Sequence, residues 1–161
     1  MTVNTLRDVI THEMSVGVQS TTQLLKKVKA SDWDYRPSHN MRTLRELADH
    51  LAAIPEVDLA IMNEKSESDV HQLEEKYAQF KTGEELAQAM KDAFDIYRET
   101  ISSLPEDVYL NKETKPFYAD FASTQAKWHV ETVTHLFHHR AQFFNYLKQL
   151  GYEVNMFDLY V

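Results

Sequence analysis

The sequence TQAKWHVETVTHLFHHRAQFFNYLKQLG, residues 124–151, decides the fold class. Its apolar residues share one sector of a helical wheel, and its histidines lie on a neighbouring stripe. We predict one helix from about Thr124 to Leu150, ended by Gly151, because glycine readily adopts the left-handed conformation of a helix C-cap. The apolar sector holds Val133, Phe137, Phe144 and Leu147. The histidine stripe also holds Trp128, Glu131, Gln142 and Tyr146.

Three further segments have the spacing of amphipathic helices. Apolar residues recur every three or four positions in 6–28, 43–63 and 82–104. A capping box, in which a threonine and a glutamate three residues later satisfy each other's backbone donors, opens the second and the third of these segments. We expect Pro55 to kink the second helix, because proline removes one backbone hydrogen bond.

Three connections separate the predicted helices. We expect a structured loop at 31–40 and, at 64–80, a solvated acidic connection with about one helical turn. Residues 106–124 are predicted to form a loop with a short extended piece. The four amphipathic segments predict an all-α protein with a single domain over 1–161. Since the connections are not all short, we expect a four-helix bundle with a long crossover.

The composition excludes several classes of function. Seventeen Lys and Arg stand against twenty-five Asp and Glu, for a formal charge of −8, so we expect no nucleic-acid partner. The chain has no cysteine, and any thiol in its chemistry would have to come from outside. Neither a signal-peptide pattern nor an apolar run near the roughly 18 residues of a membrane span is present. We therefore expect a soluble, cytoplasmic protein without a membrane partner.

Histidines are the side chains that most clearly suggest chemistry. His135 and His139 lie about 40° apart and one turn apart on a helix, so both imidazoles can reach one ion. His138 points about 60° away from His135 on the other side and is expected to be exposed. His50 of the second predicted helix lies among apolar positions and would bring a third imidazole into the bundle. Three neutral imidazoles suit zinc or nickel and leave positions open for water or substrate.

Each of these residues also has a structural interpretation. A His-x-x-x-His pair is by itself a weak motif, and a lone buried histidine such as His50 is more often hydrogen-bonded in a core. Glu131, one turn before His135, is a candidate for orienting the imidazole or accepting a proton near the metal; the alternative is a solvated helix charge. We expect the remaining histidines outside the helix to be surface residues: His12, His39 and His71.

Two stretches together resemble the DinB/YfiT-like family of metal-dependent four-helix-bundle enzymes, and the helix plan fits over nearly the whole chain. They are WDYRPSHNMRTLRELADHLA, residues 33–52, and HLFHHRAQFFNYLKQLG, residues 135–151. The resemblance implies that the metal ligands are His50, His135 and His139, with a zinc or nickel ion. His138, Arg140 and Gln142 match the family motif without being ligands, and we expect His138 and His129 to be dispensable for metal binding. Ala141 stands where the family often has glycine.

The same resemblance implies a metal-dependent hydrolase or transferase that is commonly a homodimer. Some relatives are transferases or isomerases that use a low-molecular-weight thiol such as bacillithiol or mycothiol as cosubstrate. The hypothesis for this chain is transfer of such a thiol to a small electrophilic substrate. The alternatives are a non-catalytic metal-binding stress-response protein and, ranked last, a helical interaction scaffold. No catalytic residue beyond the candidate Glu131 is predicted.

Overall fold

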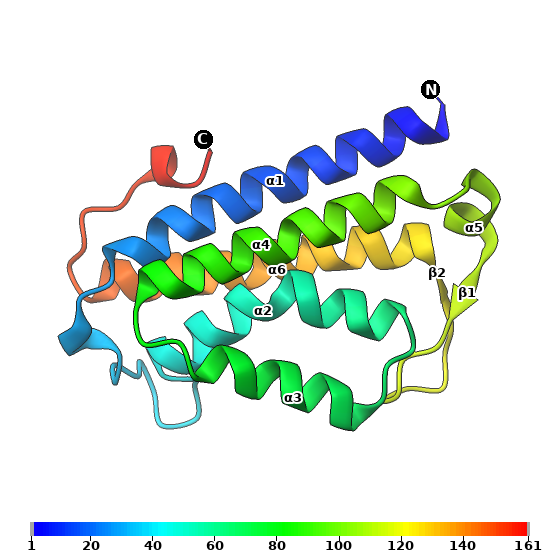
Figure 1. Ribbon diagram of the computed structural model, residues 1–161. Helices are drawn as coiled ribbons and strands as arrows, with labels where there is room; N and C mark the ends of the chain where they lie inside the picture. The colour runs from blue at the N-terminus through cyan, green and yellow to red at the C-terminus, as the bar shows by residue number, and fades with distance from the viewer. Residues whose placement is uncertain (1, 161) are drawn as a thin grey trace.

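Four long helices form the body of the molecule in the computed structural model, which describes residues 2–160 (Figure 1). Helix α1 packs on α4 and α6, and α2 packs on the opposite side of the same two helices. The bounds of the four are α1 Val3–Lys27, α2 Leu44–Met62, α4 Gly83–Ser103 and α6 Gln125–Gln149. The predicted all-α bundle is confirmed.

The ends of these helices are where the capping residues place them. Thr43 accepts from the backbone of Glu46 while the Glu46 carboxylate accepts from the backbone of Thr43, and Thr82 and Glu85 form the same reciprocal pair. Gly151 has a φ of +81° and follows the last turn of α6. Both predicted capping boxes and the predicted glycine stop are therefore confirmed.

The prediction for 64–80 was wrong. This segment contains a full helix, α3 (Glu67–Ala78), which Ser66 and Asp69 open with a further capping box. Only Val70 and Tyr77 of α3 are buried, and the remaining surface is charged, so the apolar period is too sparse to recognise in the sequence. Tyr77 donates to Glu56 of α2 at 2.8 Å. Helix α3 therefore lies along α2 as an additional layer (Figure 1).

The connection between α4 and α6 is more ordered than a loop. It holds α5 (Glu106–Asn111) and an antiparallel pair of strands, β1 (Glu113–Thr114) and β2 (Ser123–Thr124), in which Glu113 pairs with Thr124. The predicted extended piece is confirmed, whereas α5 was not predicted. Pro105 precedes α5 and acidic residues fill its first turn, both of which favour a helix start. Short 3₁₀ turns occur at Ala30–Asp32 and Met156–Asp158.

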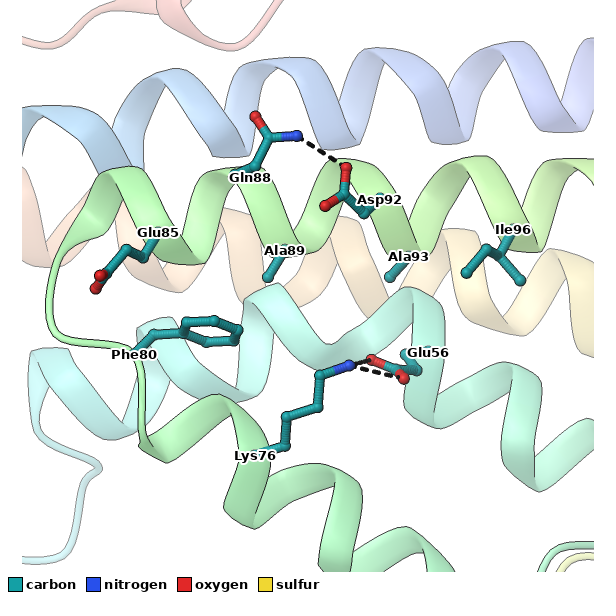
Figure 2. A pocket seen from close by; sticks show the side chains of 9 residues that line it. All are labelled: Glu56, Lys76, Phe80, Glu85, Gln88, Ala89, Asp92, Ala93 and Ile96. Carbon is teal, nitrogen blue, oxygen red and sulfur yellow. Dashed lines mark hydrogen bonds and ion pairs between the residues drawn. The ribbon is translucent and has the colours of Figure 1, made fainter.

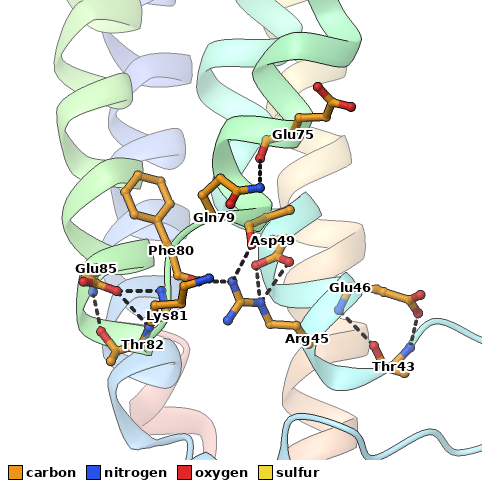
Figure 3. A network of polar contacts seen from close by, with 11 residues as sticks. Thr43, Arg45, Glu46, Asp49, Glu75, Gln79, Phe80, Lys81, Thr82 and Glu85 are labelled. Carbon is orange, nitrogen blue, oxygen red and sulfur yellow. Dashed lines mark hydrogen bonds and ion pairs between the residues drawn. The ribbon is translucent and has the colours of Figure 1, made fainter.

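Hydrogen bonds from Arg45 stabilise α2 and connect it to the turn before α4. The guanidinium of Arg45 donates to the carboxylate of Asp49 at 2.9 Å and to the backbone carbonyl of Phe80 in the turn between α3 and α4 (Figure 3). Pro55 lies within α2 without ending it. No helix within residues 2–160 is both long and apolar enough to cross a bilayer.

Candidate metal centre

Three histidines from two helices meet at one point of the bundle. His50 comes from α2, and His135 and His139 come from α6, one turn apart. One ring nitrogen from each lies within 4.8 Å of the other two. The Nε2 atoms of His50 and His135 are 3.2 Å apart, close to the ~3.3 Å between two nitrogens bound to one tetrahedral zinc. The geometry therefore suits three ligands of a single ion.

Side chains behind two of the rings determine which nitrogen faces this point. Nδ1 of His135 lies 3.1 Å from a carboxylate oxygen of Asp58, and Nδ1 of His139 lies 2.8 Å from Oε1 of Gln142. Both partners are acceptors, so each Nδ1 carries the proton and each Nε2 of a neutral ring presents a lone pair. Partners of this kind orient the histidine ligands of metal sites.

Burial keeps two of the three imidazoles, those of His50 and His139, neutral. It lowers the pKa of His50 to about 3, with a smaller effect from the neighbouring histidines, and lowers the pKa of His139 to about 4. Neutral rings are the form that binds metal. The Nε2 lone pair of His135 faces Nε2 of His50 at 3.2 Å, and either a proton on His50 or a cation between the two nitrogens satisfies this contact, so the donor set fits a cation.

The carboxylate that contacts His135 was not identified from the sequence. Asp58 follows His50 by about two turns of α2 and so projects from the same side of the helix, which is the signal that could have found it. Glu131 instead pairs with Lys127 at 2.9 Å and, within residues 2–160, makes no hydrogen bond to a histidine. Its suggested role as a proton acceptor stays a prediction.

The other histidines lie outside the cluster. His138 is exposed, as predicted, and its ring contacts the amide of Gln142 at 3.1 Å. His129 is fully buried at another part of α6, where its Nδ1 lies 2.9 Å from the hydroxyl of Tyr109. Arg140, also buried, donates to Ser20 and to the carbonyl of Leu159, so it ties the C-terminal segment to the bundle. The surface positions predicted for three others are confirmed: His12, His39 and His71.

A cavity of about 470 Å³ opens beside His50 and His135, and we call it the aromatic chamber. Its apolar walls are Val57, Ile61, Val70, Phe117, Phe121 and Trp128. Its polar walls are His50, Asp58, Glu74, Tyr118, Glu131 and His135. Partial desolvation, with Asp58 and Glu131 nearby, raises the pKa of Tyr118, so its hydroxyl stays protonated. The chamber gives a small molecule access to two of the three histidines.

A different cavity, of about 320 Å³, lies between α2, α3 and α4 (Figure 2). Lys76 reaches across it to the carboxylate of Glu56 at 2.7 Å, and Phe80 closes one end. Among residues 2–160, no histidine lines this cavity. It therefore lacks the imidazole ligands that border the aromatic chamber.

Fold and site together define a class: helical bundles with three histidines converging between two of the helices. The sequence profile of the DinB family matches residues 1–161, and the chain belongs to that family.

Solved structures agree with this membership. A protein assigned to the DinB family from Exiguobacterium sibiricum 255-15 is 27% identical, with a TM-score of 0.81 and 99% of each chain covered. Two more distant structures share the fold. A DinB-like protein from Bacillus cereus ATCC 10987 is 17% identical, with a TM-score of 0.71 over 91% of this chain and 93% of that one. The DinB-like protein YjoA from Bacillus subtilis is 16% identical, with a TM-score of 0.68 over 90% and 94%. A comparison with curated proteins gives no match.

Proposed function

We propose that this protein binds one divalent metal ion, zinc or nickel, through Nε2 of His50, His135 and His139 and transfers a low-molecular-weight thiol to an electrophile. The observation that carries the proposal is the convergence of three ring nitrogens within 4.8 Å beside a cavity of about 470 Å³. A purely structural metal site needs no adjacent cavity of ligand size. For that reason we favour the enzyme over the non-catalytic metal-binding stress-response protein.

The proposed reaction needs an external thiol, because the chain has no cysteine. An ion bound by three imidazoles supplies a Lewis acid with open positions that lowers the pKa of a thiol toward neutrality. In the transfer the thiol loses its proton to solvent, a carbon–sulfur bond forms, and the leaving group departs with the electrons of its bond to carbon. Asp58 and Gln142 hold the rings of His135 and His139 in position during this reaction.

The assay for this proposal is conjugation of monochlorobimane by untagged protein loaded with zinc or nickel. Bacillithiol, mycothiol and glutathione are supplied in turn, and the wild type is compared with His50→Ala and with His138→Ala as the matched control. We expect conjugation above the uncatalysed rate with at least one thiol, lost in His50→Ala and retained in His138→Ala. If metal is bound but no thiol supports conjugation, transfer is the wrong reaction, and hydrolysis by the same site becomes the alternative.

Two further expectations belong to this proposal. We propose a cytoplasmic location, where low-molecular-weight thiols are kept reduced. We also propose a homodimer, as the family resemblance implies, and light scattering coupled to size-exclusion chromatography measures it directly. A mass of one chain at micromolar concentration would contradict the dimer.

A further inference from the structure

We infer that the aromatic chamber binds the electrophile, and that it selects apolar molecules that are uncharged or cationic and rejects those with a negative charge at the end remote from the histidines. This inference rests on the proposed transfer reaction at the three-histidine site. It adds the class of substrate, which the fold and the family do not define.

The size and the walls of the chamber suit an aromatic or aliphatic molecule. Its volume of about 470 Å³ lies within the usual range of small-molecule sites. Phe117, Tyr118 and Phe121, all from the segment between β1 and β2, remain 42%, 58% and 51% exposed. Their exposure leaves apolar surface uncovered next to the histidines, and an apolar ligand would bury it.

Two contacts, one within the segment and one with α6, position these rings at the exposed side of the chamber, which we call its mouth. Phe117 and Tyr118 meet edge to face, with ring centroids 5.3 Å apart. The ammonium group of Lys127 lies 5.6 Å from the ring centroid of Phe121. The mouth therefore presents a defined aromatic surface on which a flat ring can stack.

The charges that line the chamber are acidic. Asp58, Glu74 and Glu131 all face it, and no lysine or arginine lines it among residues 2–160. Asp58 contacts His135 and Glu131 pairs with Lys127, whereas the nearest basic group to Glu74 is the ring of His71, at 3.9 Å. A carboxylate or phosphate in the chamber would meet like charge, while a cation would meet carboxylates and aromatic faces.

A bound metal ion adds positive charge at the histidine end only. At the histidine end, the bound thiolate and Asp58 offset the charge of the ion. Anions are therefore excluded at the aromatic end of the chamber, where the substituent remote from the reacting carbon lies. A second hollow, of about 240 Å³, also borders His50 and contains Arg42. This hollow shares Glu74 and His50 with the chamber, and it gives the thiol a second approach, to His50, on the side of Arg42.

The first test measures binding without metal or turnover, so it does not depend on the proposed reaction. The probes are three 4-hydroxymethylbiphenyls that carry hydrogen, carboxylate or trimethylammonium on the far ring. Binding to chelator-treated protein is followed by the fluorescence of Trp128, which lines the chamber, in a Trp33→Phe background that leaves no other tryptophan, with the parent protein titrated in parallel. We expect the uncharged and cationic probes to bind at least about tenfold more tightly than the carboxylate. Equal affinities, or no binding by any probe, would overturn the inference.

The second test reverses the charge at one position. Glu74→Lys should raise affinity for the carboxylate probe by about tenfold and weaken the trimethylammonium probe. Glu75→Lys is the matched control, because Glu75 is the next residue of α3 and does not line the chamber. Phe117→Ala should weaken the uncharged probe severalfold, whereas Phe157→Ala, at an exposed aromatic residue outside the chamber, should not. Identical behaviour of each variant and its control would place binding elsewhere.

Turnover then separates the two proposals. The corresponding chloromethyl compounds are offered to metal-loaded protein with the thiol that supports conjugation. If the binding order holds but nothing is conjugated, the transfer reaction is wrong and the chamber remains a binding site of the inferred selectivity. If all three compounds are conjugated at equal rates, the transfer reaction stands and the selectivity is wrong.

Discussion

At the scale of single residues, the nitrogens that face the centre are determined by hydrogen bonds behind the rings. Asp58 and Gln142 each accept from Nδ1 of one α6 histidine, which directs Nε2 to the shared point. His135 and His139 could be paired from the sequence because helical spacing alone places them on one face. The spacing of Asp58 from His50 indicates its side of α2, but its contact with His135 joins α2 to α6 and therefore depends on tertiary packing.

The orienting role of Asp58 leads to a prediction about metal affinity. Asp58→Asn should weaken zinc binding by about 10- to 100-fold, because the ring of His135 loses its anionic partner. Glu131→Gln is the matched control, since Glu131 also lies beside His135 but pairs with Lys127. Competition titration against a chromophoric chelator measures both affinities. A larger loss in Glu131→Gln than in Asp58→Asn would assign the orienting role to Glu131 instead.

His129 gives a prediction about stability and pH at a position away from the metal centre. Burial lowers its pKa from 6.5 to about 4, and Arg7 contributes in the same direction. The groups around the ring are the hydroxyl of Tyr109, the ring of Tyr97 and the hydroxyl of Thr11. Because the folded pKa lies below the unfolded one, the unfolded chain binds the extra proton, and stability falls as the pH drops from about 6.5 to about 4.

The measurement is urea unfolding of chelator-treated protein between pH 7 and about 4.5. The wild type should lose about 1–3 kcal/mol more than His129→Gln over this range. His50 and His139 titrate in both proteins, so their contribution cancels in the difference. His12→Gln, at an exposed histidine, should follow the wild type. Parallel curves for His129→Gln and the wild type would show that His129 carries no such linkage.

At the scale of helices, the sequence predicted an element correctly where a capping box and a regular apolar period occur together. Capping boxes and a regular apolar period predicted α2 and α4. Helix α3 was not predicted, because only Val70 and Tyr77 of its residues are buried and its apolar period is sparse. Helix α5 is a single short element after Pro105, with too few residues for a period to be recognised. Helix α3 supplies Glu74 to the chamber, and α5 supplies Tyr109 to the buried contact with His129.

Close packing of α4 on the end of α1 gives a prediction at this scale. A Cβ on Gly83 would lie 2.0 Å from the backbone carbonyl oxygen of Leu25, and neither backbone can move without displacing its helix. Gly83→Ala should therefore lower the free energy of unfolding by about 2–3 kcal/mol. Gly151→Ala meets no atom within 4 Å and should cost only about 1 kcal/mol, through its positive φ. Chemical denaturation of both variants compares them, and equal losses would contradict the tight contact between α1 and α4.

At the scale of the whole molecule, the site joins segments far apart in the sequence. The chamber takes side chains from α2, α3, α6 and the segment between β1 and β2. The fold brings these four parts of the chain together (Figure 1). The sequence predicted the bundle and the three-histidine cluster, because both follow from helical periodicity and from the family motif. It did not predict the chamber, since Phe117, Tyr118 and Phe121 line a cavity only when the pairing of β1 and β2 brings their segment beside α2, α3 and α6.

The metal content of untagged protein shows whether His50, His135 and His139 bind one metal ion. Elemental analysis of protein equilibrated with zinc or nickel and then dialysed should give about one ion per chain for the wild type and for His138→Ala. His135→Ala should retain much less than one, because the loss of one of three ligands leaves a weak site. Negligible metal in the wild type, or full retention in His135→Ala, would contradict the account.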